Sequence, residues 1–432
     1  MSQKTENMEK QYVQFTEEMK KEYTILVPNM LPMHFKLIMK ILSTYGYKTE
    51  LLTTEGPEIA ETGLKYVHND ACYPALLVIG QFIHALQSGK YDTKKVALIY
   101  FQTGGGCRAS NYVSLLRKAL EKAGLEYVPV IAFSFKGIEK HSGFNIKLPI
   151  LHRMLYAVLY GDLLLSLVNQ CKPYEITKGE TEALAETIVG EIAELMEKEG
   201  VSFKQLKKKS KDIVCRFAKI PLNKTDKVKV GIVGEIYVKY SPLGNNNLER
   251  FLVEEGAEVV IPGLYDFLLY CVYDGVIDKE LYGENKFFGF IMKIACKFLV
   301  KFQKKISSIV EEEGTFTPPT VFTELLEHMD DKIIGIGTKM GEGWLLPAEM
   351  IELYHSGVKN IVCTQPFGCL PNHICGKGVM KPLKDTYPDI NIVAIDYDPG
   401  ATRVNQENRI KLMLANARNE FSIPEKKFKV SL

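Results

Sequence analysis

The chain has 432 residues, which is too many for one ordinary hydrophobic core, so we expect two domains. Its 54 basic and 52 acidic side chains leave a formal net charge of +2, which predicts no nucleic-acid partner and no pull toward an anionic membrane. The charged amino terminus lacks the apolar core of a secretory signal, and no run reaches the roughly 18 to 20 uninterrupted apolar residues of a membrane span. We therefore expect a cytoplasmic protein.

Apolar runs rich in β-branched residues alternate with helical patterns in the first third of the chain. A charged leader helix is expected over residues 1–22, within a first α/β domain over residues 1–147. Its expected strands cover 23–30, 96–102 and 127–135, and its expected helices cover 34–47 and 112–124. Because strands and helices alternate, we expect a parallel sheet covered by helices.

A helical pattern over residues 148–225 predicts a connector, and a second α/β domain is expected over residues 226–432. The expected strands of this domain are 227–238, 257–264, 332–339, 360–368 and 390–400. The predicted fold is therefore α/β, with two flavodoxin/Rossmann-like parallel-sheet domains and a helical connector. Within the second domain, residues 287–305 predict an amphipathic helix with a basic stripe of Lys293, Lys297 and Lys301.

The sequence "TGGGC" follows the expected strand 96–102 and places three glycines, Gly104, Gly105 and Gly106, directly before Cys107. Glycines expose backbone N–H groups, so the loop could hold a phosphate. The spacing argues against that role, because neither G-x-x-x-x-G-K-[ST] nor G-x-G-x-x-G occurs in the loop. The glycines equally suit a close approach of the backbone to a group bound by Cys107.

Nine cysteines in a protein expected to stay reduced predict thiols, metal ligands or redox groups rather than disulfides. Glycine or proline lies near five of them, which are Cys72, Cys107, Cys363, Cys369 and Cys375. That setting favours an iron–sulfur cluster, with buried or reactive thiols as the main alternative and zinc as a lesser one. Cys271 follows an apolar run and precedes an expected turn, from which it could face a cleft between the domains. Apolar helical faces carry the others, Cys171, Cys215 and Cys296, where a cysteine is usually a small core residue.

Several motifs in order resemble the 2-hydroxyacyl-CoA dehydratase component-D superfamily, in its activase-associated branch related to double-cubane cluster proteins. The matching segments include "VHNDACYPALLVIGQ", "QTGGGCRASNY", "GEGWLLPAEM" and "CTQPFGCLPNHICGKG". The resemblance extends from about residue 22 to residue 417. It implies an oxygen-sensitive iron–sulfur cluster held by cysteines between flavodoxin-like domains, and it implies a homodimer.

The resemblance also implies which residues form the site. Carried over by motif, the cluster ligands are Cys72, Cys107 and Cys369, and Gly104, Gly105, Gly106 and Gly368 make room for the cluster. A double cubane of eight irons, in place of one 4Fe–4S cubane, would need three further thiolates. The candidates for these, in order, are Cys363, Cys271 and Cys375. Glu235 and His68 are the candidate proton acceptors.

The function implied is that of the iron–sulfur component of an ATP-coupled, two-component system. A separate activase, which this chain has no room to include, would supply electrons of low potential, and a 2-hydroxyacyl-CoA or another small molecule would be reduced or dehydrated. A non-catalytic protein that stores or passes electrons or clusters is the alternative. A third hypothesis, an α/β binding module with free thiols, predicts a colourless protein even when it is purified without oxygen.

Overall fold

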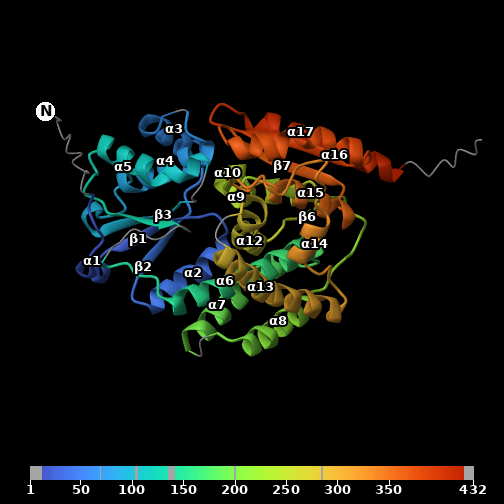
Figure 1. Cartoon of the computed structure of the whole chain (residues 1–432), viewed down its shortest axis with the longest axis horizontal. Coiled ribbons are helices and arrows are strands. Elements are labelled where there is room, and N and C mark those ends of the chain that lie inside the picture. Colours follow the sequence, from blue (N-terminus) through green and yellow to red (C-terminus); the bar gives the residue numbers. More distant parts are fainter. Residues whose placement is uncertain are drawn as a thin grey trace, which may run out of the picture.

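The computed structural model describes residues 12–68, 70–102, 106–134, 142–198, 201–283 and 286–422. Within these residues the fold is α/β, with two four-stranded sheets whose strand pairs are all parallel (Figure 1). The first sheet has the order β2-β1-β3-β4, and the second has the equivalent order β6-β5-β7-β8. The predicted α/β class with two parallel sheets is therefore confirmed.

The strands form where the sequence has short apolar runs, because strands that are covered on both faces must be apolar along their whole length. In β5, for example, every residue after the first is buried. The strands are β1 (Thr24–Pro28), β2 (Lys48–Leu52), β3 (Val96–Gln102), β4 (Val130–Ser134), β5 (Lys229–Gly234), β6 (Glu258–Val260), β7 (Asn360–Pro366) and β8 (Asn391–Tyr397).

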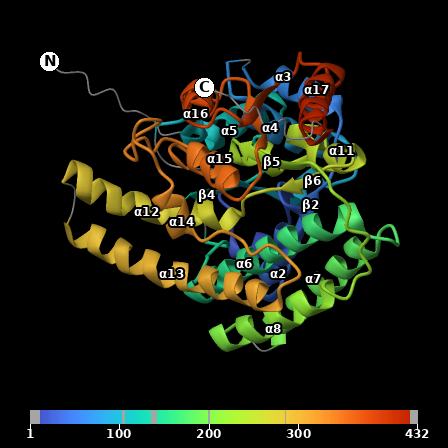
Figure 2. The same cartoon turned by 90° about the vertical axis from the view of Figure 1, so that its right-hand side faces the viewer.

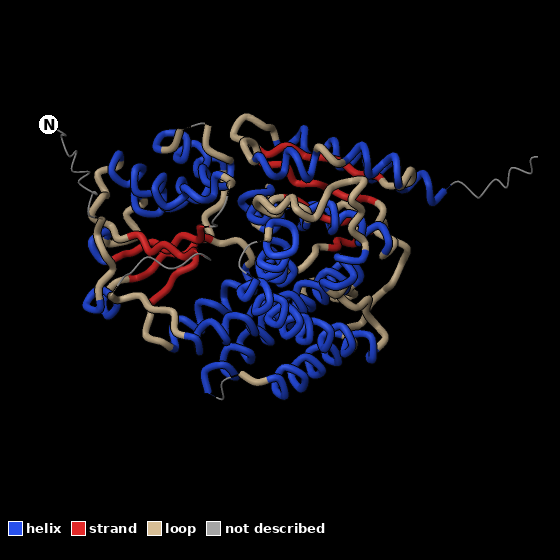
Figure 3. The backbone as a smooth tube through the Cα atoms, viewed as in Figure 1, coloured by secondary structure: helices blue, strands red, loops and turns tan. Residues whose placement is uncertain are grey.

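Helices cover both sheets and fill the space between them (Figure 3). Those of the first half are α1 (Glu17–Glu22), α2 (Pro32–Thr44), α3 (Pro57–Tyr66), α4 (Tyr73–Gln87), α5 (Tyr112–Lys122), α6 (Leu148–Cys171), α7 (Glu180–Lys198) and α8 (Phe203–Phe217). Those of the second half are α9 (Ile236–Tyr240), α10 (Pro242–Asn245), α11 (Leu248–Glu254), α12 (Leu264–Tyr282), α13 (Lys286–Glu313), α14 (Phe322–Glu327), α15 (Leu345–His355), α16 (Met380–Thr386) and α17 (Arg403–Ser422).

The helices between the sheets share one core with the first sheet. α6 packs against α2 of the first half and against β6 and α12 of the second. One buried apolar cluster accordingly contains Ile25 of β1, Leu163 of α6 and Trp344 next to α15. Among the described residues, α6 is the one helix that is long and apolar enough to cross a membrane. Of its most apolar 18-residue stretch, 61% is buried inside the protein.

Three details of the predicted elements were wrong. The strand expected over residues 332–339 is instead a series of turns, because Gly335 and Gly337 weaken a strand and only Ile333 of this segment is buried. Cys271 lies inside α12 rather than before a turn, since that helix continues to Tyr282. Cys215, expected in the core, is exposed on α8. Of the expected leader helix, the described part forms α1 only from Glu17.

Candidate metal centre between the two sheets

Two loops from different sheets meet in direct backbone contact. The N–H of Tyr73, at the start of α4, donates a hydrogen bond of 2.9 Å to the carbonyl of Phe367, which follows β7. Next to it, Gly368 has a φ of +72°, and a Cβ at this position would lie 3.2 Å from atoms of Ala71, Cys72 and Arg108. Only glycine fits this conformation without crowding, so Gly368 lets the loop that carries Cys369 lie against Cys72.

Cys72 is the residue directly before α4 and is almost fully buried. Its Sγ lies 2.7 Å from the hydroxyl of Tyr112, the first residue of α5. Tyr112 in turn stacks on Tyr100 of β3, with ring centroids 5.4 Å apart. Burial raises the pKa of the Cys72 thiol to about 11, against the opposing effect of the Tyr112 hydrogen bond. A bound metal ion would reverse this shift, because a coordinating thiol is deprotonated.

Cys107 and Cys369 are the other two predicted ligands. An ionised Cys107 affects the pKa of Cys72, and an ionised Cys72 affects the pKa of Cys369. Cys107 precedes a short 3₁₀ helix, Arg108–Asn111, and its Sγ accepts the N–H of Ala109 at 3.3 Å. An ionised Cys107 would raise the pKa of Cys72. Cys369 follows β7, and burial raises its pKa, with smaller contributions from the charges of Glu342, Glu235 and Cys72. The structure thus gathers three buried or half-buried thiols at the carboxyl ends of β3 and β7 and the start of α4.

Two buried carboxyl groups border these thiols. Glu235 directly follows β5 and caps α9 by accepting the N–H of Val238 at 2.9 Å. Glu342 accepts the N–H of Ile236 at 2.9 Å, so the two carboxyls bind the first turn of the same short helix. Burial, and after it the charge of Glu342, raises the pKa of Glu235 to about 8. At neutral pH this pair therefore retains a proton in the folded protein.

The raised pKa of Glu235 makes stability depend on pH. In the unfolded chain the group ionises near pH 4.5, whereas in the fold it stays protonated up to about pH 8. Because the folded state binds the extra proton in this window, the free energy of unfolding should fall between pH 5 and 8, by about 1.4 kcal/mol per pH unit at the steepest. Urea unfolding of the metal-free protein at pH 5, 6, 7 and 8 measures this slope. Glu235→Gln should reduce the slope without abolishing it, because burial also raises the pKa of Asp274 to about 7, and Glu254→Gln, at an exposed residue, should leave the slope unchanged.

The charge of Glu342 acts on two of the three further cysteine candidates, and on Cys271 it acts after the larger charge of Asp274. The charge of Glu342 contributes to the raised pKa of Cys271, about 12, and to that of Cys375, about 11, although burial is the largest cause in both. Cys363 is in a different place. It is fully buried in β7, its Sγ faces Asn372 and Gly376, and the charges that act on it are those of Asp396 and Glu349.

The remaining predicted residues are His68 and the glycines before Cys107. His68 is exposed and pairs with Asp70 at 3.2 Å, and its carbonyl accepts the N–H of Ala71, the residue before Cys72. Gly104 and Gly105 lie outside the described residues. Gly106 lies against the side chain of Met340, and a Cβ there would come within 2.7 Å of the Met340 sulfur.

Sequence reasoning missed the aromatic and acidic lining of the site. Tyr112 and Glu342 both lie in segments that the resemblance uses, "QTGGGCRASNY" and "GEGWLLPAEM", but neither was singled out. Two features of the sequence could have identified these residues. Glu342 is a carboxyl between two glycines, and Tyr112 is a tyrosine at the start of the helix that follows Cys107. Buried hydroxyls at Tyr100, Tyr237 and Tyr270 have no hydrogen-bond partner among the described residues. Unpaired buried polar groups are costly and mark places where a ligand or water is expected.

Among the described residues, no three or more His, Cys, Asp or Glu side chains lie close enough together to share one metal ion. Burial, glycines at Gly106 and Gly368 and a hydroxyl donor to Cys72 are features that suit an iron–sulfur cluster.

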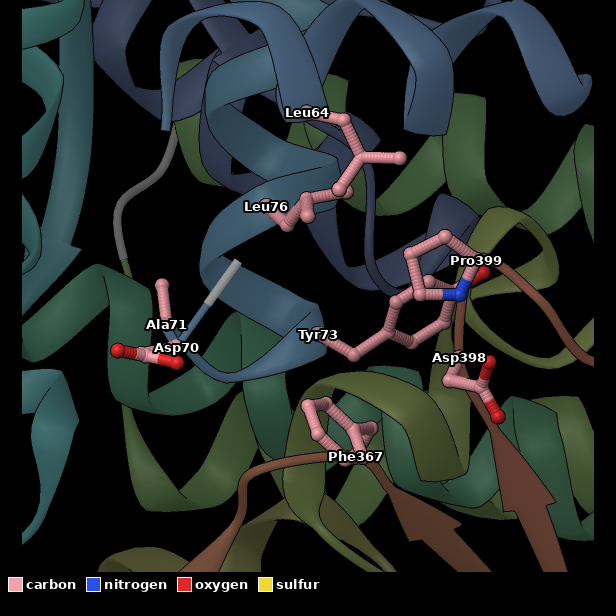
Figure 4. A pocket seen from close by; sticks show the side chains of 8 residues that line it. All are labelled: Leu64, Asp70, Ala71, Tyr73, Leu76, Phe367, Asp398 and Pro399. Atoms are coloured by element: carbon pink, nitrogen blue, oxygen red, sulfur yellow. The ribbon is translucent and has the colours of Figure 1, made fainter. Parts of the chain in front are cut away.

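A small cavity of about 260 Å³ opens beside Cys72, on the seam between the two halves of the chain. Figure 4 shows the ring of Tyr73 beside Pro399, with Asp398 next to both. The lining residues are Leu64, Asp70, Ala71, Tyr73, Leu76, Phe367, Asp398 and Pro399. The cavity therefore combines an apolar wall with two carboxylates.

Comparison with known proteins adds no assignment, because neither a protein-family model nor a curated protein matches this chain.

Proposed function

We propose that this protein is the iron–sulfur component of an ATP-coupled, two-component reductase or dehydratase system, in the 2-hydroxyacyl-CoA dehydratase component-D superfamily. The observation that carries the proposal is the backbone contact between Tyr73 and Phe367, together with Gly368, which sets the loop of Cys369 against Cys72 and against Arg108, the neighbour of Cys107. The strand order also supports the proposal. Both sheets have the order 2-1-3-4, counted from the first strand of each half, and the first four strands of a flavodoxin-like sheet have the same order. In such open sheets, ligands bind beyond the carboxyl ends of the strands.

In this proposal the three thiolates hold the cluster, and the cluster supplies one-electron reduction at low potential. Gly368 keeps the two loops together, and the N–H of Ala109 and the hydroxyl of Tyr112 donate to ligand sulfurs, which stabilises added negative charge on them. The Glu235–Glu342 pair is the group that could accept or supply a proton beside the thiols. His68, which is exposed and pairs with Asp70, is a weaker candidate for that role. A separate activase would deliver the electron.

The role of Tyr112 can be measured directly. Tyr112→Phe removes the hydroxyl that lies 2.7 Å from the Cys72 sulfur. Losing a hydrogen bond worth about 1 kcal/mol in the reduced state should lower the reduction potential of the cluster by about 40 mV. A redox titration followed by electron paramagnetic resonance gives this value. Tyr100→Phe is the matched control, because its buried hydroxyl has no hydrogen-bond partner in the described structure. A shift of equal size in both variants would contradict the role given to Tyr112.

One observation favours the alternative of a non-catalytic electron carrier. The cavity beside Cys72 measures about 260 Å³, slightly below the roughly 300 to 1,000 Å³ of ordinary small-molecule sites. Its carboxylates, Asp70 and Asp398, would also repel the phosphates of coenzyme A.

A turnover assay distinguishes a catalytic component from a non-catalytic electron carrier. The protein, purified without oxygen, would be mixed with an activase, ATP and titanium(III) citrate, and then with 2-hydroxyacyl-CoA thioesters of different chain lengths. An enzyme should consume a thioester in an ATP-dependent manner. A carrier should cycle its cluster between oxidation states with no loss of thioester. A protein whose absorption and paramagnetic spectra show no ATP-dependent reduction would contradict both roles.

A further inference from the structure

The cavity beside Cys72 lies between segments that are far apart in the sequence. One wall comes from α3 and the start of α4, and the other comes from the residues that follow β7 and β8. Figure 1 and Figure 2 both show α3 and α4 on the same side of the molecule as α17, the helix after β8. The N–H of Tyr73 donates to the carbonyl of Phe367 at 2.9 Å, and the N–H of Phe367 donates to the carbonyl of Tyr397 at 2.8 Å. The cavity is therefore fixed by the fold, at the edge where open parallel sheets bind ligands.

The cavity is negatively charged. Asp70 and Asp398 line it, and no lysine, arginine or histidine is among its lining residues. Within the part of the chain that the structure describes, Asp398 forms no ion pair, whereas Asp396 of the same strand pairs with Lys377 at 3.3 Å. Asp70 pairs with the exposed His68 at 3.2 Å. The cavity thus offers an uncompensated carboxylate, which attracts a cation and repels an anion.

The carboxylate of Asp398 is held in place beside aromatic rings. Its Oδ1 accepts the N–H of Gly400 at 2.7 Å, which orients the side chain. Figure 4 shows this carboxylate next to the rings of Tyr73 and Phe367. Burial, and after it the charge of Asp398, raises the pKa of Tyr73 to about 12, in agreement with their proximity. The faces of aromatic rings attract cations as well, because their π electrons make them negative.

The rest of the wall indicates which kind of cation fits. The side chains of Leu64, Leu76 and Pro399 offer no oxygen ligand, whereas a magnesium or calcium ion requires about six or more oxygens around it. An organic cation uses such a wall, because its carbon atoms bury apolar surface while its charge stays beside the carboxylate. The volume of about 260 Å³ suits a small molecule of this kind.

We infer that this cavity binds a small alkylammonium ion. Its charged group lies against the carboxylate of Asp398 and the rings of Tyr73 and Phe367. Its alkyl carbons lie against Leu64 and Leu76. The inference does not use the cysteines or any cluster bound to them, so it and the proposed function can each fail without the other.

Calorimetric titration of the full-length protein with choline and with 3,3-dimethyl-1-butanol tests the inference. The two probes have nearly the same shape, but choline has a charged nitrogen where the alcohol has a carbon. Choline should bind one site per chain at least about 10-fold more tightly than the alcohol, as expected for a cation beside aromatic faces and a carboxylate. n-Butylammonium should compete with choline for the same site.

Variants locate the site. Asp398→Asn should weaken choline binding at least about 10-fold and leave binding of the alcohol unchanged. Asparagine keeps an oxygen that can accept the N–H of Gly400, so the circular dichroism spectrum should be preserved. Phe367→Leu, at a side chain that is 55% exposed, should weaken choline binding about 3-fold or more. The matched control is Asp385→Asn, which removes an exposed carboxylate on α16 and should leave choline binding unchanged.

Three results would overturn the inference. The first is equal affinity for choline and the alcohol, or choline binding that Asp398→Asn does not change. The second is the absence of binding by both choline and n-butylammonium at concentrations up to about 10 mM. The third is displacement of choline by magnesium chloride at about 1 mM, which would indicate a metal site instead.

Discussion

Alanine at Cys72, Cys107 or Cys369 is expected to reduce the iron content of the anaerobically purified protein to near zero. Each substitution removes one of the three thiolates proposed to hold the cluster, and two remaining thiols do not replace it. Burial raises the pKa of Cys72 and of Cys369, so in the absence of iron these groups are thiols rather than thiolates. Iron and acid-labile sulfide per chain, measured for each variant, give the result.

Matched controls are available elsewhere in the chain. Cys171 is fully buried in α6 and Cys215 is exposed on α8, so alanine at either position should leave the iron content unchanged. The iron content of alanine variants of Cys271, Cys375 and Cys363 then distinguishes a single cubane from a double cubane. The charge of Glu342, which acts on Cys271 and Cys375, leads us to expect an effect there before any effect at Cys363. Full iron in the Cys72→Ala protein would contradict the proposed ligand set.

Lys239→Met is expected to lower the free energy of unfolding by about 3 to 5 kcal/mol. The Lys239 Nζ lies 2.9 and 3.2 Å from the two carboxylate oxygens of Glu349, and both side chains are almost completely buried. Removing the lysine leaves a carboxylate with no partner in a place that water does not reach, because the pair joins α9 to α15 inside the second half of the chain. Urea unfolding of the variant and the parent protein under identical conditions measures the loss.

Two further variants identify the cause of that loss. Lys239→Met combined with Glu349→Leu should recover most of the stability, since an apolar pair of similar size can replace a buried ion pair. Lys381→Met removes the lysine of an exposed pair with Asp385 and should cost less than about 1 kcal/mol. A double variant as unstable as the single one would show that packing, rather than an unpaired charge, is responsible.

The spacing of apolar residues and the length of each apolar run predicted most of the fold. Strands such as β3 and β7 are short apolar runs followed by glycine or proline, and a helix such as α5 has a regular apolar face, so local sequence specifies them. β2 was missed because "KTELL" has only one buried residue and gives little apolar signal. The segment predicted as a strand over residues 332–339 is also apolar, but it contains Gly335 and Gly337, and glycines weaken the interior of a strand.

Part of the candidate site was predictable for a different reason. In a parallel sheet the loops at the carboxyl ends of strands share one edge, so the order of strands and helices along the chain is enough to assign the thiols of Cys107 and Cys369 to such edges. That the two edges face each other depends on α6 and on the contact at Gly368, which connect residues far apart in sequence. Glu342 reaches Glu235 across more than a hundred residues, and no local pattern indicates such a contact.

The measurement that tests the central claim most directly is iron and acid-labile sulfide per chain in protein purified and reconstituted without oxygen. The proposal predicts a brown protein with about four irons and four sulfides for one cubane, or about eight of each for a double cubane. A colourless protein with negligible iron after reconstitution would contradict it. The chain would then be an α/β binding module whose buried cysteines are ordinary thiols.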